Sequence, residues 1–145
     1  MATIANLEVE QVRQHLIAGG FLAAFSDIFG NAQPAPQTQI NELRLDNLSK
    51  YDRAIMIRNT GGTNNPTTST FFNQRNMMIV VVGNIGETDS IIANGLAIDI
   101  NEYLLNTPYD GECLANISTS GVSGPFTLPE GRRAYEINFN AMFNV

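Results

Sequence analysis

Apolar and polar side chains alternate almost without interruption in residues 134–143. Because successive side chains of a β-strand face opposite sides of a sheet, this pattern predicts a strand with one buried face. The polar residues Glu136, Asn138 and Asn140 are expected to face outward. The residues expected to face the core are Tyr135, Ile137, Phe139, Ala141 and Phe143.

Two earlier segments also predict strands. In residues 53–59, Ile55 and Ile57 share one face with Arg53, which is expected at the solvent end of that face. Residues 77–83, with the sequence MMIVVVG, form the most hydrophobic run and are too short for a typical core helix. We expect this run to be the central strand, buried on both faces.

The N-terminal part has helical periodicity. Apolar residues recur at helical spacing between residues 7 and 29, which predicts one long helix or two short ones with a break at Gly19 and Gly20. Residues 31–37 contain two prolines and predict a connector. The short pattern in residues 40–48 is compatible with a strand or with a turn of helix.

A second helix is predicted over residues 88–106. Thr88 can accept a hydrogen bond at the N-cap, and Thr107-Pro108 is expected to end the helix. One stripe of side chains is expected to face the core. Its members are Ile91, Ile92, Leu96, Ile100, Tyr103 and Leu104.

The segment that follows this helix is less regular. Residues 114–118 alternate loosely and predict a short strand. Glycines and prolines then punctuate the chain up to Gly131, so we expect a connection in which Phe126 and Leu128 pair briefly.

The order of these elements predicts the fold class. Two hairpins flank one crossover helix, without an internal repeat, which is typical of a single α+β domain. We expect a mixed or antiparallel sheet of four to five strands with helices packed mainly on one face. Residues 1–30 would form an N-terminal helical segment, residues 31–50 a connector, and residues 51–145 the sheet with its crossover helix.

Composition favours a folded protein that contacts other proteins. The chain has 145 residues, of which 43% are hydrophobic and 15% are charged, which is enough for one core. Much of the polar surface must then come from Asn, Thr, Ser and Gln, which are cheaper to desolvate at an interface than Lys or Glu.

Charge and cysteine content exclude several classes. The net charge is −6 and Lys50 is the only lysine, which argues against sequence-specific nucleic-acid binding, because such binding draws its affinity from clustered Lys and Arg. The single cysteine, Cys113, allows neither an internal disulfide nor a multi-cysteine zinc site and is expected to be a small buried side chain. Neither a secretory signal nor a membrane span is predicted, so we expect the protein in the cytoplasm or inside a particle.

The sequence offers little support for catalysis. His15 is the only histidine, so we expect a surface or capping side chain instead of a metal ligand or an acid–base pair. Asp99 and Glu102 are expected on the solvated face of the second helix. Neither a nucleophile elbow nor a phosphate-binding glycine motif occurs. We therefore expect no enzyme activity, no cofactor and no metal.

Arginines and one loop remain as candidate contact residues. Arg75, Arg132 and Arg133 lie at the foot of predicted strands, where they would be either solvated caps or bidentate partners for the carboxylates of a neighbouring subunit. Residues 60–70 are rich in turn formers and short of apolar anchors, which is compatible with a functional loop or with a plain connection. From this loop we select Thr63, Asn64 and Asn65.

Several segments together resemble the tail terminator (tail completion) proteins of long-tailed bacteriophages. The likeness extends from Arg53 onward and is one of element order and strand texture. The segments that carry it are YDRAIMIRNTGG, NMMIVVVGN, INEYLLN and GPFTLPEGRRAYEINFNAMF.

This resemblance implies a structural protein that forms a ring, commonly a hexamer, at the head-proximal end of the tail tube. In that family the ring ends tube polymerisation and provides the surface to which the head attaches. The implied partners are other copies of the chain, the tail tube protein and a head-completion protein. The implied location is the virion tail, after assembly in the host cytoplasm.

Two alternatives stay open at this stage. A head-completion or connector protein of the phage neck could have a similar small fold. A small-molecule binding module could form a pocket between the last strand and the second helix.

Overall fold

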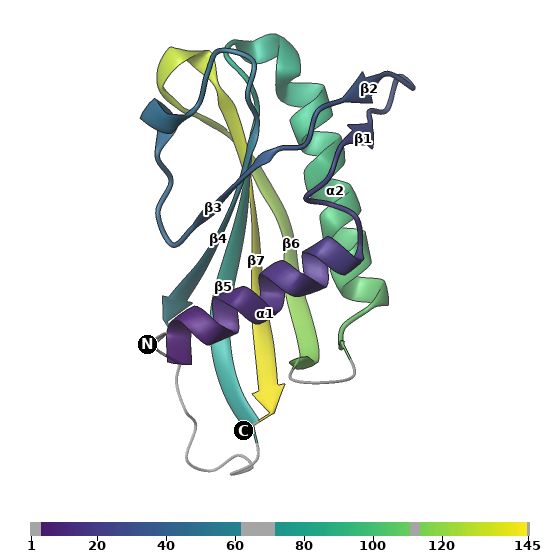
Figure 1. The fold of residues 1–145 in the computed structure, drawn as a ribbon, viewed down its shortest axis with the longest axis vertical. Helices are drawn as coiled ribbons and strands as arrows, with labels where there is room; N and C mark the ends of the chain where they lie inside the picture. The colour runs from purple at the N-terminus through teal and green to yellow at the C-terminus, as the bar shows by residue number, and fades with distance from the viewer. Residues whose placement is uncertain (1–3, 62–71, 111–113, 145) are drawn as a thin grey trace.

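The computed structural model describes residues 4–61, 72–110 and 114–144. Within these ranges the chain forms two α-helices, a five-stranded mixed sheet and a small two-stranded hairpin (Figure 1). This architecture confirms the predicted α+β domain. The elements are α1 (Ile4–Ala18), β1 (Phe25–Ser26), β2 (Ala32–Gln33), β3 (Gln37–Ile40), β4 (Ala54–Gly61), β5 (Phe72–Val82), α2 (Ser90–Asn106), β6 (Leu114–Thr127) and β7 (Arg133–Asn144).

The strand order of the main sheet is β3-β4-β5-β7-β6. β3 runs parallel to β4, and the other neighbouring strands are antiparallel. In this register Ile79 of β5 lies between Ile57 of β4 and Ile137 of β7. The prediction that the MMIVVV run forms the central strand is therefore confirmed.

Both described helices pack on one face of the sheet, which we call the helix face. The alternation predicted for residues 134–143 is confirmed, because all five of its apolar side chains are buried there. α1 contributes Val9, Val12 and Leu16 to the same core. Fully burying a large apolar side chain stabilises a fold by roughly 1.5–3 kcal/mol, so this layer holds the helices on the sheet.

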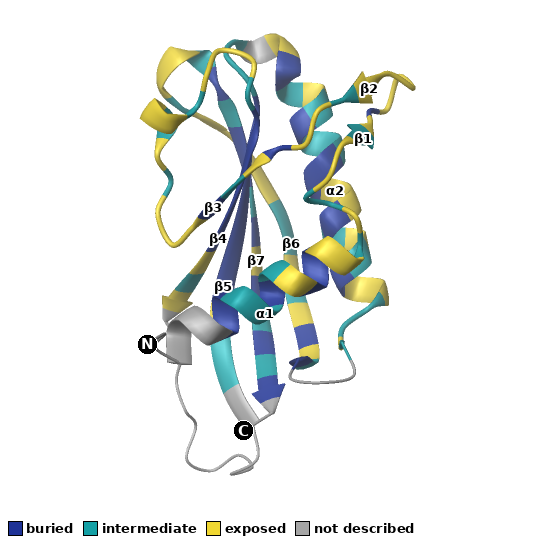
Figure 2. Cartoon of the chain, in the orientation of Figure 1, coloured by how far each residue is buried: buried dark blue, intermediate teal, exposed yellow. Residues whose placement is uncertain are grey.

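The opposite face of the sheet, which we call the open face, carries a second and smaller apolar cluster. Because residues of the two faces alternate along each strand, consecutive residues are buried in β4 and β5 (Figure 2). Neither of the two described helices covers the open face. Instead, leucines of the segment between β3 and β4, together with Leu128, pack against part of the cluster. The cluster itself comprises Ala54, Met56, Met78, Val80, Val82 and Ala134.

The N-terminal prediction is half right. The chain breaks at the two glycines as expected, since α1 ends at Ala18 and Gly20 has φ of +83°. The second helix is wrong, because residues 25–33 form the hairpin β1–β2 instead. The Asp27 side chain stabilises a turn in which Gly30 has φ of +81°. This turn is favoured over the helix that the apolar spacing predicts. The predicted connector of residues 31–37 accordingly contains β2.

The second helix starts later than predicted. Asp89, and not Thr88, occupies the N-cap position, and its side chain makes no capping hydrogen bond. The helix ends where expected, with the Thr107 N–H donating to the Tyr103 carbonyl oxygen at 2.8 Å. Ile91, which was predicted to face the core, is exposed. The buried stripe of α2 differs from the predicted one and includes two alanines. Its members are Ala93, Leu96, Ala97, Ile100 and Leu104.

β6 is much longer than the predicted short strand. It continues to Thr127 through Gly121 and Gly124, which we expected in a connection. Two of the three irregularities in its pairing with β7 accommodate these residues, because a β-bulge inserts extra residues without ending a strand. In residues 40–48, the end of β3 and a 3₁₀ turn at Leu45–Asn47 account for the ambiguous pattern.

Candidate subunit-interface surfaces

Arg132, one of the predicted contact residues, lies inside the fold. Its side chain is 0% exposed. Nη1 donates to the carbonyl oxygens of Asp52 at 2.9 Å and Gly83 at 3.0 Å, and Nη2 donates to that of Ser49 at 2.8 Å. The guanidinium thus ties the loop before β4 to the end of β5 and offers no surface to a neighbouring molecule. Arg132 is therefore not carried into the proposed interface.

Arg75 lies on β5 and faces α1. Its Nε donates to Glu8 Oε2 at 2.9 Å, and the Asn59 amide donates to the same oxygen at 3.2 Å. The ion pair is largely buried, so it fastens the helix to two neighbouring strands. A contact between Arg75 and a second subunit stays a prediction.

Arg133 is the first residue of β7 and is partly exposed. Its Nη1 donates to the Thr127 hydroxyl at 3.2 Å and to the Gly131 carbonyl oxygen at 3.4 Å. This position at the surface is compatible with the predicted contact, which stays a prediction. The residues Thr63, Asn64, Asn65 and Cys113 lie outside the described part of the chain.

His15 is buried, contrary to a helix-surface position, and caps the other helix. Its Nε2 lies 2.7 Å from the carbonyl oxygen of Thr107. Because a carbonyl oxygen only accepts, Nε2 carries the proton. The Tyr103 hydroxyl donates to the His15 carbonyl oxygen at 3.0 Å, and burial raises the pKa of Tyr103. These bonds join the C-terminal ends of α1 and α2.

The carboxylates considered for metal binding behave as a solvated face. Asp99 and Glu102 are both exposed on α2. Within the described ranges, no three His, Cys, Asp or Glu side chains gather where they could hold a metal ion. No helix in the same ranges is long and apolar enough to cross a membrane.

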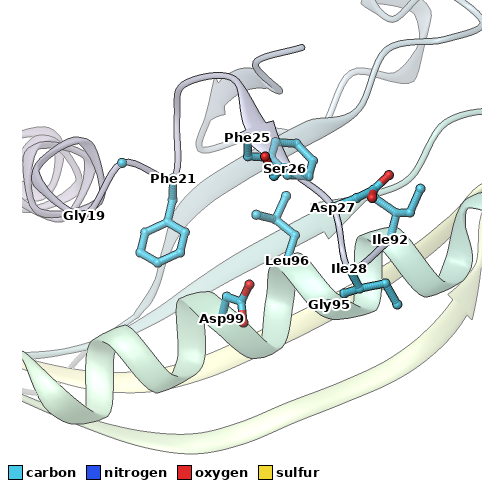
Figure 3. A pocket seen from close by; sticks show the side chains of 11 residues that line it. Gly19, Phe21, Phe25, Ser26, Asp27, Ile28, Ile92, Gly95, Leu96 and Asp99 are labelled. Atoms are coloured by element: carbon cyan, nitrogen blue, oxygen red, sulfur yellow. The ribbon is translucent and has the colours of Figure 1, made fainter. Parts of the chain in front are cut away.

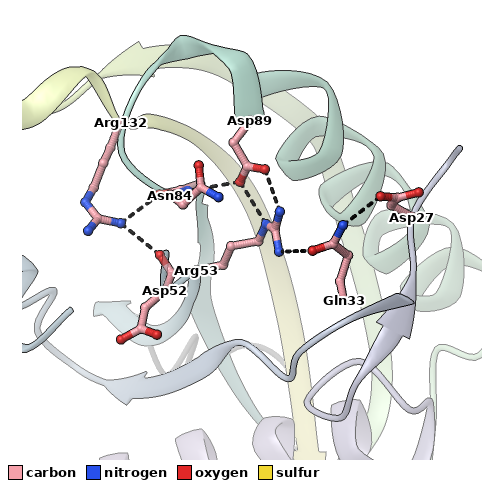
Figure 4. A network of polar contacts seen from close by, with 8 residues as sticks. Asp27, Gln33, Asp52, Arg53, Asn84, Asp89 and Arg132 are labelled. Carbon is pink, nitrogen blue, oxygen red and sulfur yellow. Dashed lines mark hydrogen bonds and ion pairs between the residues drawn. The ribbon is translucent and has the colours of Figure 1, made fainter. Parts of the chain in front are cut away.

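A buried polar network links the hairpin β1–β2 to the main sheet (Figure 4). Arg53 forms a two-bond ion pair with Asp89, with Nε donating to Oδ2 at 2.8 Å and Nη2 donating to Oδ1 at 2.6 Å. Nη1 donates to Gln33 Oε1 at 2.9 Å, and Gln33 in turn donates to Asp27 Oδ2 at 2.8 Å. Asp89 also accepts the Asn84 N–H. The network fixes the hairpin relative to β4 and α2.

Asp27 also shapes the turn at the end of this hairpin. Its Oδ1 accepts the backbone N–H groups of Phe29 and Asn31, both at 2.9 Å. The Asn31 hydrogen bond is the largest cause that lowers the pKa of Asp27, with smaller contributions from Gln33, Phe29 and Arg53, while burial works in the opposite direction. The ionised carboxylate therefore holds the turn in one conformation.

This fixed turn presents two large apolar side chains to solvent. Ile28 is 59% exposed and Phe29 is 64% exposed; we call the pair the hairpin tip. Turns usually carry polar residues, and a rigidly held apolar pair loses little conformational freedom when a partner covers it. The hairpin tip is therefore a candidate contact.

A small hollow of about 120 Å³ lies between the hairpin and α2 (Figure 3). Phe25 and Ile28 line it on the hairpin side, and Leu96 and Asp99 line it on the helix side. Gly95 lets Ile28 approach closely, since a Cβ at that position would lie 2.9 Å from Ile28 Cγ2. The hollow therefore has an exposed carboxylate, that of Asp99, in the same lining as Ile28.

The open face carries an apolar groove of about 240 Å³. Its floor is formed by strand residues of β4, β5 and β7, and its walls by Leu43, Phe126 and Leu128. Phe126 is 44% exposed. The charged side chains in the lining of the groove are Arg58 and Glu136. The floor residues are Met56, Met78, Val80 and Ala134.

Beyond the groove, the open face continues as a row of neutral amides. The Gln74 amide donates to Asn140 Oδ1 at 2.8 Å, and the Asn140 amide donates to Asn76 Oδ1 at 2.9 Å. The row joins β5 to β7. Uncharged amides of this kind are cheaper to bury against a partner than Lys or Glu.

β6 forms one edge of the main sheet, because it pairs only with β7 in the described chain. An unpaired edge can template the addition of another strand. The three register shifts along β6 distort that edge, as bulges do in proteins that avoid edge-to-edge pairing. The edge is therefore a poorer docking surface than the hairpin tip or the groove.

Sequence reasoning did not identify the hairpin tip, the groove or the polar network. Arg53 was predicted at the solvent end of its face, and this is wrong because the side chain is buried against Asp89. A signal for the network was present, since Arg53 is in phase with the buried Ile55 and Ile57. An arginine whose side chain points to the core side of a strand requires a buried partner for its charge. The turn signal was the Asp27 to Gly30 spacing, which is typical of an Asx turn.

A comparison with protein families finds one whose description is phage tail termination protein; its sequence model matches residues 6–145. The match covers nearly the whole chain, including most of α1 and the hairpin, which precede the segments that carry the resemblance. A search of curated proteins finds no match.

Proposed function

This chain belongs to the phage tail termination protein family, and we propose that it caps the head-proximal end of the tail tube as a ring. Membership of the family supports a role as a tail terminator and a place in the virion tail. The finer proposal is that the ring stops the addition of tube subunits and then provides the surface to which the filled head attaches. The protein acts structurally and transforms no substrate.

The family match over residues 6–145 is the observation that carries this proposal. The surface is compatible with it. The open face combines an apolar groove with neutral amides, and the hairpin tip exposes two large apolar side chains. A ring of more than two identical subunits joined head to tail requires two unlike and complementary surfaces on each subunit, and these two apolar surfaces are candidates.

Tube growth in the presence of the protein tests the proposal. Purified tail tube subunits would be polymerised with increasing amounts of this chain, and tube lengths and end-bound protein would be measured by electron microscopy. We expect shorter tubes with density on one end. Unchanged tube lengths together with binding to portal-bearing heads would assign the protein to head completion instead.

A further inference from the structure

We propose that the hairpin tip of one subunit inserts into the open-face groove of the next, so that the partner of the groove is a second copy of this chain. The inference rests on the proposed ring and names the surfaces that would form it. It commits to one contact, in which Phe29 and Ile28 are the inserted side chains.

The two surfaces lie on opposite sides of the sheet. The hairpin packs on α2, as the lining shared by Ile28 and Leu96 shows (Figure 3), and α2 covers the helix face. The groove lies on the open face, over Met56 and Met78. A tip and a groove on opposite sides cannot meet within one subunit, but they can join successive subunits head to tail.

The chemistry of the two surfaces matches. The tip presents an aliphatic and an aromatic side chain, and the groove offers methionine, valine and leucine side chains around Phe126. Aromatic side chains bury a large area and favour offset or edge-to-face contacts with other rings, while methionine adapts to irregular shapes. Phe29 can therefore pack against Phe126 on a floor that contains Met56 and Met78.

The exposed charges beside the two surfaces are opposite, although the groove lining also holds the half-buried Glu136. Asp99 is exposed on α2 and lines the same hollow as Ile28. Arg58 is exposed in the lining of the groove. When the tip enters the groove, the carboxylate and the guanidinium come to the rim of the same contact. Complementary charges at a rim fix the register of an interface and disfavour wrong pairings.

The contact is prepared before association. Asp27 holds the turn through two backbone hydrogen bonds, and the Arg53 network holds the hairpin on the domain (Figure 4). Ordering costs on association are correspondingly small. The amide row of Gln74, Asn76 and Asn140 adds a neutral surface beyond the groove, which suits part of the rim that excludes water from a central apolar contact.

Complementary variants test the inference. Phe29→Asp removes the tip and keeps the groove, whereas Phe126→Asp damages the groove and keeps the tip. Each alone is expected to lower self-association about tenfold or more, since the truncation of a central aromatic contact has effects of this order. Mixed in equal amounts, the two variants are expected to form a heterodimer, because one intact tip meets one intact groove. Tyr109→Asp, a control at another exposed aromatic position, is expected to associate like the wild type.

A charge exchange tests the rim. Arg58→Glu and Asp99→Arg should each weaken association, and the double variant should recover most of it. Association would be measured by analytical ultracentrifugation and native mass spectrometry, for the protein alone and bound to tube ends, with circular dichroism to verify the fold.

The inference would be overturned if Phe29→Asp self-associated as strongly as the wild type. It would also be overturned if the double variant Arg58→Glu/Asp99→Arg did not recover the association that each single variant loses. A wild-type protein that is monomeric both alone and on tubes would likewise overturn it. Tube length under the wild-type protein is scored separately. If wild-type rings shorten tubes and Phe29→Asp does so equally well, the function stands and this contact is wrong. If the wild-type protein leaves tube length unchanged, the proposed function itself fails.

Discussion

The guanidinium of Arg53 and the carboxylate of Asp89 form a two-bond ion pair that is almost completely buried. Arg53 directly precedes β4, and Asp89 is the N-cap of α2. The pair is also the centre of the polar network that joins the hairpin β1–β2 to the domain. One ion pair therefore fixes the start of α2 and, through Gln33, the position of the hairpin tip. Its energetics can be tested directly.

Asp89→Ala is expected to lower the free energy of unfolding by about 3–5 kcal/mol, because it leaves the Arg53 charge buried without its partner. It also removes the acceptor of the Asn84 N–H. Urea unfolding would measure the change, with the m-value as a check that the extent of unfolding is unaltered. As a control, Glu10→Ala breaks the exposed pair with Arg13 and is expected to change stability by less than about 1 kcal/mol. Equal effects of the two substitutions would contradict the prediction.

Arg132 and Arg133 are neighbours in sequence but are expected to respond differently to substitution. Arg132→Lys keeps the charge, but a lysine ammonium lacks the planar guanidinium geometry that donates to three carbonyl oxygens at once. We expect a loss of about 2 kcal/mol or more in the free energy of unfolding, as buried acceptors lose their donor. Arg133→Lys changes a partly exposed side chain and is expected to stay within about 1 kcal/mol of the wild type.

Thermal and urea unfolding of these two variants would measure the difference. If Arg132→Lys were as stable as Arg133→Lys, the bonds to Ser49, Asp52 and Gly83 would contribute nothing to stability. A charge reversal at an interface is informative only at Arg133, because Arg132→Glu is expected to disrupt the fold itself.

The pattern of apolar residues predicted the strands of the sheet, because burial in the core requires apolar side chains at regular positions along each strand. The alternation of β7 and the apolar run of β5 each match a strand that is buried as the pattern requires. The hairpin β1–β2 escaped prediction because its apolar residues share helical spacing, while a few local hydrogen bonds to Asp27 decide the conformation. Local turn chemistry outweighs a periodic pattern when no continuous helix face can be buried.

The candidate surfaces depend on contacts that sequence spacing does not reveal. Arg53 and Asp89 are 36 positions apart, and the groove combines residues of three strands with Phe126 and Leu128. Arg132 has the same sequence surroundings as Arg133, yet only one of them turns into the fold. Which arginine is buried is set by the loop of Ser49 and Asp52, and that loop lies about 80 positions earlier.

The Asp27 turn is expected to weaken in acid. The folded-state pKa of Asp27 lies below its usual value of 3.8, so its contribution to stability is present above that value and is lost as the pH falls toward the lower folded-state pKa. The wild-type free energy of unfolding should therefore fall more steeply between pH 5 and pH 3 than that of Asp27→Asn, by the linkage of proton binding to folding. Phe29→Ala keeps the backbone donors of the turn and should retain the wild-type slope. Parallel curves for the wild type and Asp27→Asn would contradict this assignment.

Adjacent residues on β7 provide a test of the two faces of the sheet. Ile137 is fully buried on the helix face, opposite Ile79 of β5, while Asn138 is exposed on the open face. Ile137→Ala removes buried methyl groups at the centre of the core and is expected to lower the free energy of unfolding by about 2–5 kcal/mol. Asn138→Ala is expected to change it by less than about 0.5 kcal/mol. A slip of the strand by one residue would exchange the two faces, so a larger loss for Asn138→Ala than for Ile137→Ala in urea unfolding would show that the register is wrong.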